Sequence, residues 1–324
     1  MKTVAGLGST MLRAGSSSRR LAVGSRGQAP STSDRKVDAA TVDSYQRDGA
    51  VVLRGLLSGN EVEMLREAIN WNMAHPGSLA GIASADSDPG RFFEDFCNWA
   101  RLPGYERLAF ESALPRVAAC LMHSRRVRLH HDHVLVKEPR TQQPTPWHQD
   151  QPYYNVSGRQ NVSFWIPVDP VPLESTLEFV AGSHADGKWY LPKTFLTKEA
   201  KWFPDGSLAD VPDVQPHEVL RWALEPGDAV AFHMLTLHGS AGSTALRRAF
   251  SIRMIGDDAR HAPRPWRTSP HFDGLADELE AGAEMDHPLF PIVYDEDQGG
   301  CVRSRSWTAV PDCDSPARCR TPNV

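Results

Sequence analysis

The 324-residue sequence is 40% hydrophobic and 23% charged, which is the composition of a globular protein with one large domain or two small ones. This composition excludes a chain that is disordered throughout. No apolar run approaches the roughly 20 residues that a membrane-spanning helix needs, so the sequence predicts no transmembrane segment.

The charge is unevenly distributed along the chain. Lysine and arginine number 35 against 40 aspartate and glutamate residues, which gives a net charge of −5. Residues 1–36 carry seven basic residues and one acidic residue, so this segment contributes +6 and the rest of the chain −11. Phosphate contacts need clustered cations, so a body with a charge of −11 argues against nucleic-acid binding.

The N-terminus and the cysteines bear on the cellular compartment. Residues 1–36 are rich in serine and arginine and lack any acid before Asp34, a composition typical of an organelle transit peptide. A disordered tail explains it equally well. The prediction is therefore a mitochondrial protein if the segment is a transit peptide, and otherwise a cytoplasmic one. The five cysteines form no CxxC pair, which is typical of a reducing compartment.

The N-terminal third of the sequence favours helices. In chain order, the hydrophobic spacing predicts a helix over 39–47, a strand over 50–54, a helix that begins at Ser58, a loop over 77–90 and a helix over 104–123. Ser58 and Glu61 have the spacing of a capping box, and Pro115 interrupts the last helix.

From Arg126 onward the hydrophobic period changes to two, which indicates strands. The predicted strands cover 127–137, 162–168, 177–180, 229–233 and 248–255. Short strands with long connections predict a mainly β fold with flanking helices, a double-stranded β-helix or jelly roll of the cupin type, with the N-terminal helices packed on one sheet. The connection 184–224 is too long for a turn and is expected to act as a lid.

Four His-x-Asp pairs are candidates for a metal site. A facial site needs two imidazoles and one carboxylate, and residues i and i+2 of a strand face the same way. Thirteen histidines would produce about this number of pairs by chance, so context must select at most one. The pairs are His130/Asp132, His148/Asp150, His184/Asp186 and His271/Asp273.

The context of the second pair resembles that of a known family. The ordered motifs are DGAVVL at 48–53, PWHQDQPYY at 146–154, a strand at 161–168, LEFVAGSH at 177–184, EPGD at 225–228 and HGS at 238–240. Over about residues 41–258, this set resembles the phytanoyl-CoA dioxygenase family of Fe(II)- and 2-oxoglutarate-dependent oxygenases.

The resemblance implies a metal site and a reaction. His148 and Asp150 become the first two iron ligands and His238 the third, while His184 belongs to a structural Gly-Ser-His turn. The implied cofactors are Fe(II), the cosubstrate 2-oxoglutarate and O₂, and the implied enzyme is a dioxygenase that hydroxylates a small organic molecule with release of succinate and CO₂. Related halogenating enzymes replace the carboxylate ligand with a small residue, so Asp150 points to hydroxylation or another oxidation.

Such an enzyme also needs a cation for the far carboxylate of 2-oxoglutarate, because a buried carboxylate without a partner is costly. Arg247 and Arg248 are the candidates. Alternation places Arg247 on the face with small and polar residues and Arg248 on the face with Phe250 and Ile252. If helices cover the apolar face, Arg247 points inward, and the resemblance also places the cosubstrate arginine at Arg247.

The resemblance implies further cosubstrate contacts from Trp165 and Ser240, and it places His133 on a strand position beside the cosubstrate. A plain core role for Trp165 and an ordinary turn role for Ser240 stay open. Lys137 shares a strand face with His133, but a lysine at a strand end is usually solvated, so it is not included in the site.

The sequence therefore predicts three parts: a tail or transit peptide over 1–36, a dioxygenase domain over 37–258, and an irregular C-terminal extension over 259–324 that wraps the domain. Two alternatives to an oxygenase stay open, a cupin-like isomerase or hydrolase that uses zinc or manganese, and a non-catalytic binding module. The expected partner is a small-molecule substrate, with no nucleic acid and no membrane, and the sequence sets no oligomeric state.

Overall fold

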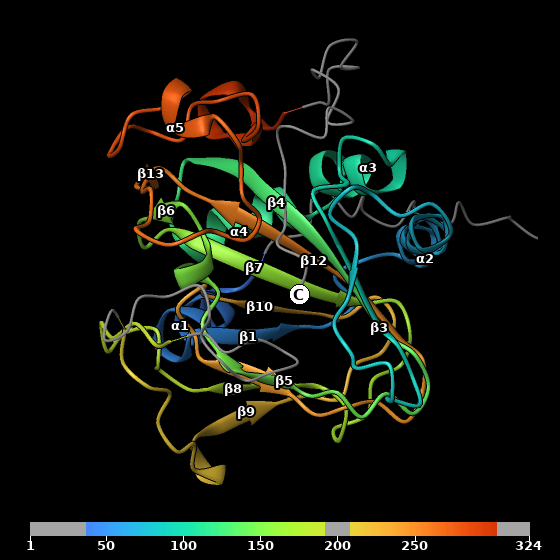
Figure 1. Ribbon diagram of the computed structural model, residues 1–324. Coiled ribbons are helices and arrows are strands. Elements are labelled where there is room, and N and C mark those ends of the chain that lie inside the picture. Colours follow the sequence, from blue (N-terminus) through green and yellow to red (C-terminus); the bar gives the residue numbers. More distant parts are fainter. Residues whose placement is uncertain (1–36, 192–207, 303–324) are drawn as a thin grey trace, which may run out of the picture. The chain divides into compact units, whose positions relative to one another are not determined.

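The computed structural model describes residues 37–191 and 208–302 (Figure 1). The chain divides into two units, Met1–Pro30 and Ser31–Val324, and all of the described residues belong to the second unit. Three predictions fall wholly or partly outside the described residues: the tail or transit peptide of 1–36, part of the lid at 192–207, and the end of the C-terminal extension at 303–324.

Four helices lie in the part of the chain before Arg126. They are α1 (Ala39–Asp48), α2 (Gly59–Ala74), α3 (Pro103–Glu111) and α4 (Leu114–Met122). The predicted capping box of Ser58 and Glu61 is formed at the start of α2. The stretch predicted as one interrupted helix is two, because Pro115 fits only into the first turn of a helix and so belongs to the start of α4.

Nine strands form a large antiparallel sheet in the order β1-β10-β7-β12-β4-β14-β15, with β3 also paired to β4 and β2 to β3. Their bounds are β1 Ala50–Leu53, β2 Gly81–Ile82, β3 Phe92–Phe96, β4 Arg126–Lys137, β7 Asn161–Pro167, β10 Ala229–Phe232, β12 Arg247–Ile255, β14 Ile292–Asp295 and β15 Gly300–Cys301.

A second, smaller sheet faces the first and has the strand order β5-β11-β8-β9. Its strands are β5 Thr145–His148, β8 Leu177–Val180, β9 Val219–Arg221 and β11 His238–Ser240. The remaining elements are β6 Val156–Ser157 and β13 Arg260–His261, which pair with each other, α5 Leu275–Glu278, and the short 3₁₀ helices η2 Gln151–Tyr153, η3 Pro216–Glu218 and η4 Glu296–Gln298.

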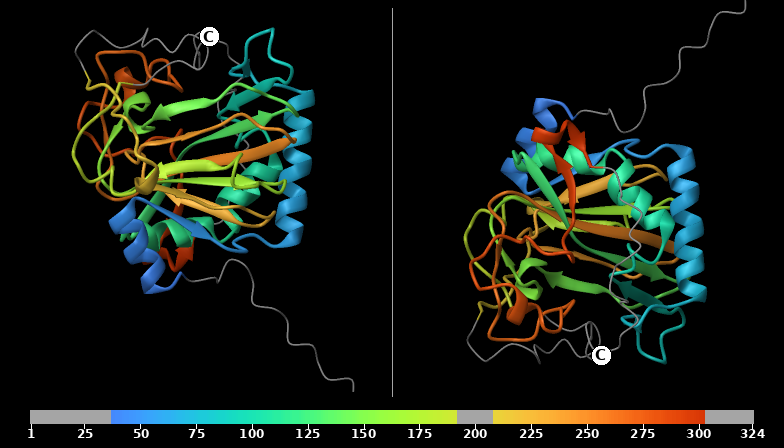
Figure 2. Two further views of the ribbon diagram at one scale, coloured as in Figure 1. Left: turned by 90° about the horizontal axis from the view of Figure 1, so that it is seen from below. Right: turned by 90° about the horizontal axis from the view of Figure 1, so that it is seen from above.

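The two faces of the large sheet pack against different partners. On the outer face, Phe164, Phe250 and Ile252 join the core that the helices cover, and Figure 2 shows α2 running across the strands. On the inner face, Trp165 and Phe232 pack with residues of the small sheet. This two-sheet arrangement, with helices on one sheet, is the predicted fold.

The structure also contains strands that the sequence did not indicate. They are β2, β3, β5, β6, β9, β11, β13, β14 and β15, all of five residues or fewer, too short for a period of two to stand out. The stretch expected to be irregular after residue 258 contributes β13, α5, β14 and β15, and β14 extends the large sheet by pairing with β4. In the described residues, no helix has the length and hydropathy needed to span a bilayer.

Candidate metal centre

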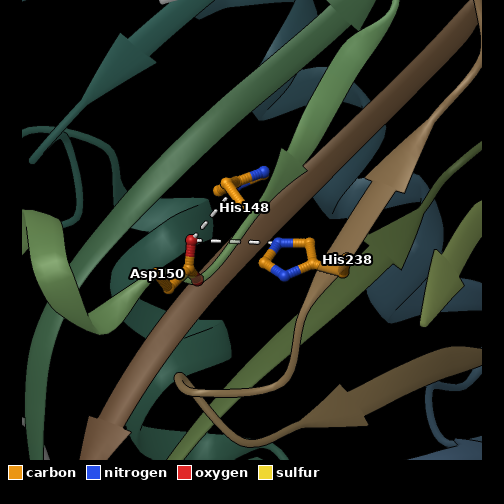
Figure 3. A group of neighbouring side chains, drawn as sticks. All are labelled: His148, Asp150 and His238. Atoms are coloured by element: carbon orange, nitrogen blue, oxygen red, sulfur yellow. Dashed lines mark ion pairs between the residues drawn. The ribbon is translucent and has the colours of Figure 1, made fainter. Parts of the chain in front are cut away.

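Three side chains converge between the two sheets, where β5 ends and β11 begins (Figure 3). Asp150 Oδ1 lies 3.7 Å from His148 Nε2 and 3.9 Å from His238 Nε2. One ligand atom from each residue lies within 4.8 Å of the others, and Asp150 and His238 are buried. The structure therefore brings together the three residues that the resemblance implies as ligands.

Two elements position these residues. His148 ends β5 and His238 begins β11, and the two are paired residues of the small sheet. Asp150 follows β5 in a helical conformation, with φ −73° and ψ −41°, at the start of η2. The predicted alternation of His148 and Asp150 along one strand is thus wrong, because a turn after the strand brings Asp150 beside His148.

The two imidazoles are oriented by backbone carbonyls. His148 Nδ1 donates to the carbonyl of Pro146 at 2.7 Å, and His238 Nδ1 donates to the carbonyl of Thr236 at 2.9 Å. Because Nδ1 carries the proton, Nε2 of each ring presents a lone pair toward Asp150. Burial lowers the pKa of His238 to about 3, so this ring is neutral, as a metal ligand must be.

The second oxygen of Asp150 is held by the large sheet. Asp150 Oδ2 accepts a hydrogen bond from Ser163 Oγ at 3.1 Å and another from Arg253 Nη2 at 3.4 Å. Burial acts to raise the pKa of Asp150, but the charge of Arg253 and the neighbouring His148 and His238 outweigh it and hold the pKa well below its usual value. Asp150 is therefore an ionised carboxylate with one oxygen free to bind a metal.

This donor set fits a divalent iron ion. Two neutral imidazole nitrogens and one carboxylate oxygen on one side of a point form the facial triad that non-haem Fe(II) oxygenases use, with the opposite positions open. Zinc accepts the same ligand types, so the donor set alone does not distinguish iron from zinc. The residues beside the site bear on that choice.

The other His-x-Asp pairs have different partners. His130 contacts His131 and Asn155, and Asp132 accepts from the backbone N–H groups of Asn98 and Trp99. His184 Nε2 donates to the carbonyl of Gln46, His271 contacts Asp273 and Thr268, and His233 contacts the carbonyl of Arg159. Within the described residues, His148, Asp150 and His238 are the only group of three such side chains placed to hold a metal ion.

A second cluster on the inner face contains two buried basic side chains, Arg247 and Lys137. Arg247 points inward, as alternation predicts, whereas Arg248 points outward and pairs with Asp169. Arg247 donates to the carbonyl of Ser175, and its guanidinium lies 5.5 Å from the ring centre of Trp165. No carboxylate lies within 4 Å of Arg247 in the described part of the chain.

Lys137 is a residue of this cluster that the sequence did not place in the site. It is opposite Arg247 in the pairing of β4 with β12 and is fully buried. Its Nζ donates to the carbonyl of Ala241 at 2.8 Å and to Ser240 Oγ at 3.4 Å. Burial, and then the charge of Arg247, lower the pKa of Lys137 to about 6. Two buried basic groups, neither within 4 Å of a carboxylate among the described residues, indicate a binding site for an anion.

The remaining predicted cosubstrate residues fall into two groups. Trp165, under Arg247, and Ser240, beside Lys137, belong to the cation cluster. His133 does not contact these cations; its Nε2 donates to Glu94 Oε2 at 3.3 Å. Glu94 lies on β3, a strand that directly follows the predicted loop and that no hydrophobic pattern indicated.

The residue between His148 and Asp150 anchors the start of the predicted lid. Gln149 Nε2 donates to the carbonyls of Lys188 and Leu235, and Gln149 Oε1 accepts from the N–H of Tyr190 at 2.9 Å. Gln149 is fully buried. The beginning of the 184–224 connection is thus fixed to the segment that carries His148 and Asp150.

Comparison with known proteins agrees with this geometry. The model of the family described as phytanoyl-CoA dioxygenase (PhyH) matches residues 45–249. The chain belongs to the phytanoyl-CoA dioxygenase family. The predicted family is confirmed, and it is a family of Fe(II)- and 2-oxoglutarate-dependent enzymes.

Proteins that this phytanoyl-CoA dioxygenase family member is similar to include enzymes of several activities. The ectoine dioxygenase of Sphingopyxis alaskensis is 24% identical over 274 residues, which cover 78% of this chain and 89% of the relative. The carbocyclase SnoK from nogalamycin biosynthesis has a TM-score of 0.63 at 23% identity and covers 82% of this chain and 99% of its own. The epimerase SnoN, in complex with Fe³⁺, alpha ketoglutarate and nogalamycin RO, has a TM-score of 0.60 at 24% identity. The match covers 78% of this chain and 97% of SnoN. These structures confirm the predicted fold.

Proposed function

We propose that this protein is an Fe(II)- and 2-oxoglutarate-dependent dioxygenase that hydroxylates a small organic molecule and converts 2-oxoglutarate to succinate and CO₂. The observation that carries the proposal is a pair of neighbouring sites between the two sheets: a His-Asp-His group, and the buried basic side chains Arg247 and Lys137, which have no carboxylate within 4 Å in the described residues. A zinc isomerase or hydrolase has no need of the second site.

In this proposal His148, Asp150 and His238 hold the iron. Their Nε2, Oδ1 and Nε2 atoms already face one another, and the carbonyls of Pro146 and Thr236 fix both rings. Ser163 and Arg253 hold the other Asp150 oxygen, so the carboxylate presents a single oxygen to the metal. When bound, iron supplies the activation of O₂ for oxidation of a C–H bond.

Arg247 and Lys137 bind the far carboxylate of 2-oxoglutarate. Arg247 can form two parallel hydrogen bonds to a carboxylate, and Lys137 adds a second charge from the neighbouring strand. Ser240 has its hydroxyl beside Lys137, and the Trp165 ring forms a wall under the guanidinium. The cosubstrate would supply the negative charge that this cluster lacks in the protein alone.

Hydroxylation is the reaction that the ligand set supports best. Asp150 is present and ionised, so no ligand position is vacated for a halide. The related ectoine dioxygenase was solved with 2-oxoglutarate and 5-hydroxyectoine, and it has a TM-score of 0.56 with this chain at 20% identity. Carbocyclase and epimerase activities occur on the same fold, so product analysis must accompany any activity measurement.

The test combines iron content with cosubstrate turnover. The purified protein is loaded anaerobically with Fe(II) and 2-oxoglutarate and then exposed to air, and succinate is measured. We expect His148→Ala and His238→Ala to lose bound iron and succinate formation. His271→Ala is the matched control, since His271 also forms a His-x-Asp pair, and should keep both. His130→Ala and His184→Ala should also keep iron near normal.

Two outcomes would contradict the proposal. Loss of iron in His271→Ala with normal iron in His148→Ala would overturn the ligand assignment. An iron-loaded protein that neither binds nor consumes 2-oxoglutarate would favour an isomerase, a hydrolase or a binding module. Zinc and manganese loading in parallel identifies which metal supports a reaction.

A further inference from the structure

Strand β3 presents a carboxylate to the inner face of the large sheet. Its residues alternate: Phe93 packs in the core under the helices, and Asp95 bonds to Asn72 of α2. Phe92, Glu94 and Phe96 therefore share the opposite, inner face. β3 pairs with β4 (Figure 1), which places Glu94 opposite Leu135 and Phe96 opposite His133.

Glu94 has a neutral partner. In the described residues its side chain makes one polar contact, with His133 Nε2 at 3.3 Å, and no lysine or arginine lies within 4 Å. Burial lowers the pKa of His133, and the hydrogen bond and charge of Glu94 offset only part of this lowering. The His133 ring is therefore uncharged at neutral pH. The His133 ring stacks on Phe96 with centroids 3.7 Å apart.

This group lies near the metal centre. The ring of Tyr153 lies 6.0 Å from that of His148, and the charge of Glu94 acts on Tyr153 as well as on His133. His133 is also paired with Ser251 of β12, and Ser251 with Trp165 of β7. Glu94 is therefore part of the surroundings of the proposed reaction site and not of a remote surface.

The inner face thus has an unmatched negative charge at Glu94. A carboxylate taken out of water is costly unless a cation pairs with it, and aromatic faces such as Phe96 also attract cations. The side chains of Glu94 and His133 keep 8% and 9% of their surface accessible. By contrast, the unpartnered Nε and Nη1 of Arg253 are inaccessible, so that guanidinium offers no comparable place for an anionic group.

We propose that Glu94, His133 and Phe96 form a subsite that binds a positively charged nitrogen of the substrate, such as an ammonium or amidinium group. The proposal rests on the proposed function and narrows its substrate to a nitrogen cation. Arg247 and Lys137 take the negative charge of the cosubstrate, whereas Glu94 takes the positive charge of the substrate.

The first test needs no variant and no known substrate. Mn(II) and 2-oxoglutarate are bound to the intact protein, and Mn(II) then relaxes the NMR signals of small molecules that bind nearby. The probes are tetramethylammonium and tert-butanol, a neutral molecule of similar shape. We expect paramagnetic relaxation of tetramethylammonium to exceed that of tert-butanol at least about tenfold, as for a buried charge pair. Equal relaxation of the two would overturn the subsite.

Glu94→Gln should abolish the preference for tetramethylammonium while leaving 2-oxoglutarate affinity within about twofold, because the amide keeps the shape of the side chain and loses its charge. Glu178→Gln is the control, since Glu178 pairs with Arg221 on β9 and lies away from this cluster. A preference that survives Glu94→Gln would overturn the assignment. If the wild-type protein binds no Mn(II) and 2-oxoglutarate, the proposed function fails too; if it binds them without preferring the cation, only the subsite fails.

Substrate screening gives a second readout. Amines and amidines are compared with their N-acetyl derivatives by succinate release from the Fe(II)-loaded protein. We expect the stimulating compounds to carry a cationic nitrogen, N-acetylation to cut stimulation at least about tenfold, and Glu94→Gln to raise the substrate KM by a similar factor. Stimulation by neutral or acidic compounds alone would contradict the proposal.

Discussion

Arg253 on β12 donates from Nη2 to Asp150 Oδ2 across 3.4 Å, joining two residues that are 103 positions apart. Both side chains are almost completely buried, and two other nitrogens of Arg253, Nε and Nη1, have no hydrogen-bond partner among residues 37–191 and 208–302. A guanidinium buried with so few acceptors is costly. Its contact with Asp150 gives it a role, which is to hold the carboxylate so that Oδ1 faces the two imidazoles.

Replacing Arg253 should therefore weaken metal binding although Arg253 touches no metal. We expect Arg253→Met to lower Fe(II) affinity by about 10- to 100-fold, the usual effect of removing a partner of a metal ligand. Anaerobic Fe(II) titration measures this. Arg248→Met is the matched control, because Arg248 lies on the same strand and pairs with Asp169 on the outer face. Equal affinities in the two variants would contradict the role given to Arg253.

Asp150→Gly should abolish the oxidation activity and should also remove the carboxylate that pairs with Arg253. We expect no hydroxylated product, since one ligand is lost, and a free energy of unfolding lower by about 3–5 kcal/mol, since Arg253 is left as an uncompensated buried charge. Adding Arg253→Met should recover part of that loss. Urea denaturation of the metal-free proteins measures the second effect. Oxidation at the wild-type rate would show that Asp150 does not bind the metal.

Arg247 and Arg248 should differ sharply in their effect on the cosubstrate. Truncating a buried cation paired with a carboxylate costs about 2–5 kcal/mol, so Arg247→Ala should raise the 2-oxoglutarate Kd at least about tenfold. Arg248→Ala should change it by only a few-fold, and Arg247→Lys should rescue in part, because an ammonium makes no paired contact. Anaerobic titration with 2-oxoglutarate checks the ranking, and the reverse ranking would mean that the outer face binds it.

Lys137 should make cosubstrate binding depend on pH. Its pKa is lowered to about 6 by burial and by Arg247, with Asp88 opposing, so it is mostly neutral at pH 7 in the free protein. A bound carboxylate raises this pKa, so the complex holds an additional proton. Affinity for 2-oxoglutarate should then fall as pH rises above about 6, by up to about tenfold per pH unit, until the pKa of the complex is reached. Lys137→Met should flatten the profile; a flat wild-type profile would exclude this role.

Gly49 should be needed for the packing beside the metal centre. It has φ +77°, and an added Cβ would overlap His184 Nδ1 and Thr236 Oγ1. The carbonyl of Thr236 also accepts the hydrogen bond from His238 Nδ1. A displacement of Thr236 by the added Cβ would therefore disturb a proposed metal ligand. We expect Gly49→Ala to lower the free energy of unfolding by about 1–3 kcal/mol. Gly59→Ala, with no atom within 4 Å of its added Cβ, should be neutral or slightly stabilising in urea denaturation.

Local patterns in the sequence were sufficient for much of the fold. The capping box of Ser58 and Glu61 depends on four consecutive residues, and the opposite orientations of Arg247 and Arg248 depend only on the pleat of one strand. The family motifs around His148 and His238 likewise could be read in order along the chain. Such features are visible because the physical cause lies within a few residues of the effect.

Contacts between distant segments were decided by the tertiary structure alone. Lys137 has the sequence context of a solvated strand end. It is buried because three other segments of the chain bring Phe92, Arg247 and Ser240 against it. Glu94 acquires its place beside His133 because β3 pairs with β4, and Arg253 meets Asp150 because the two sheets close on each other. Burial and charge pairing depend on which segments meet in space, and no spacing along the chain specifies that.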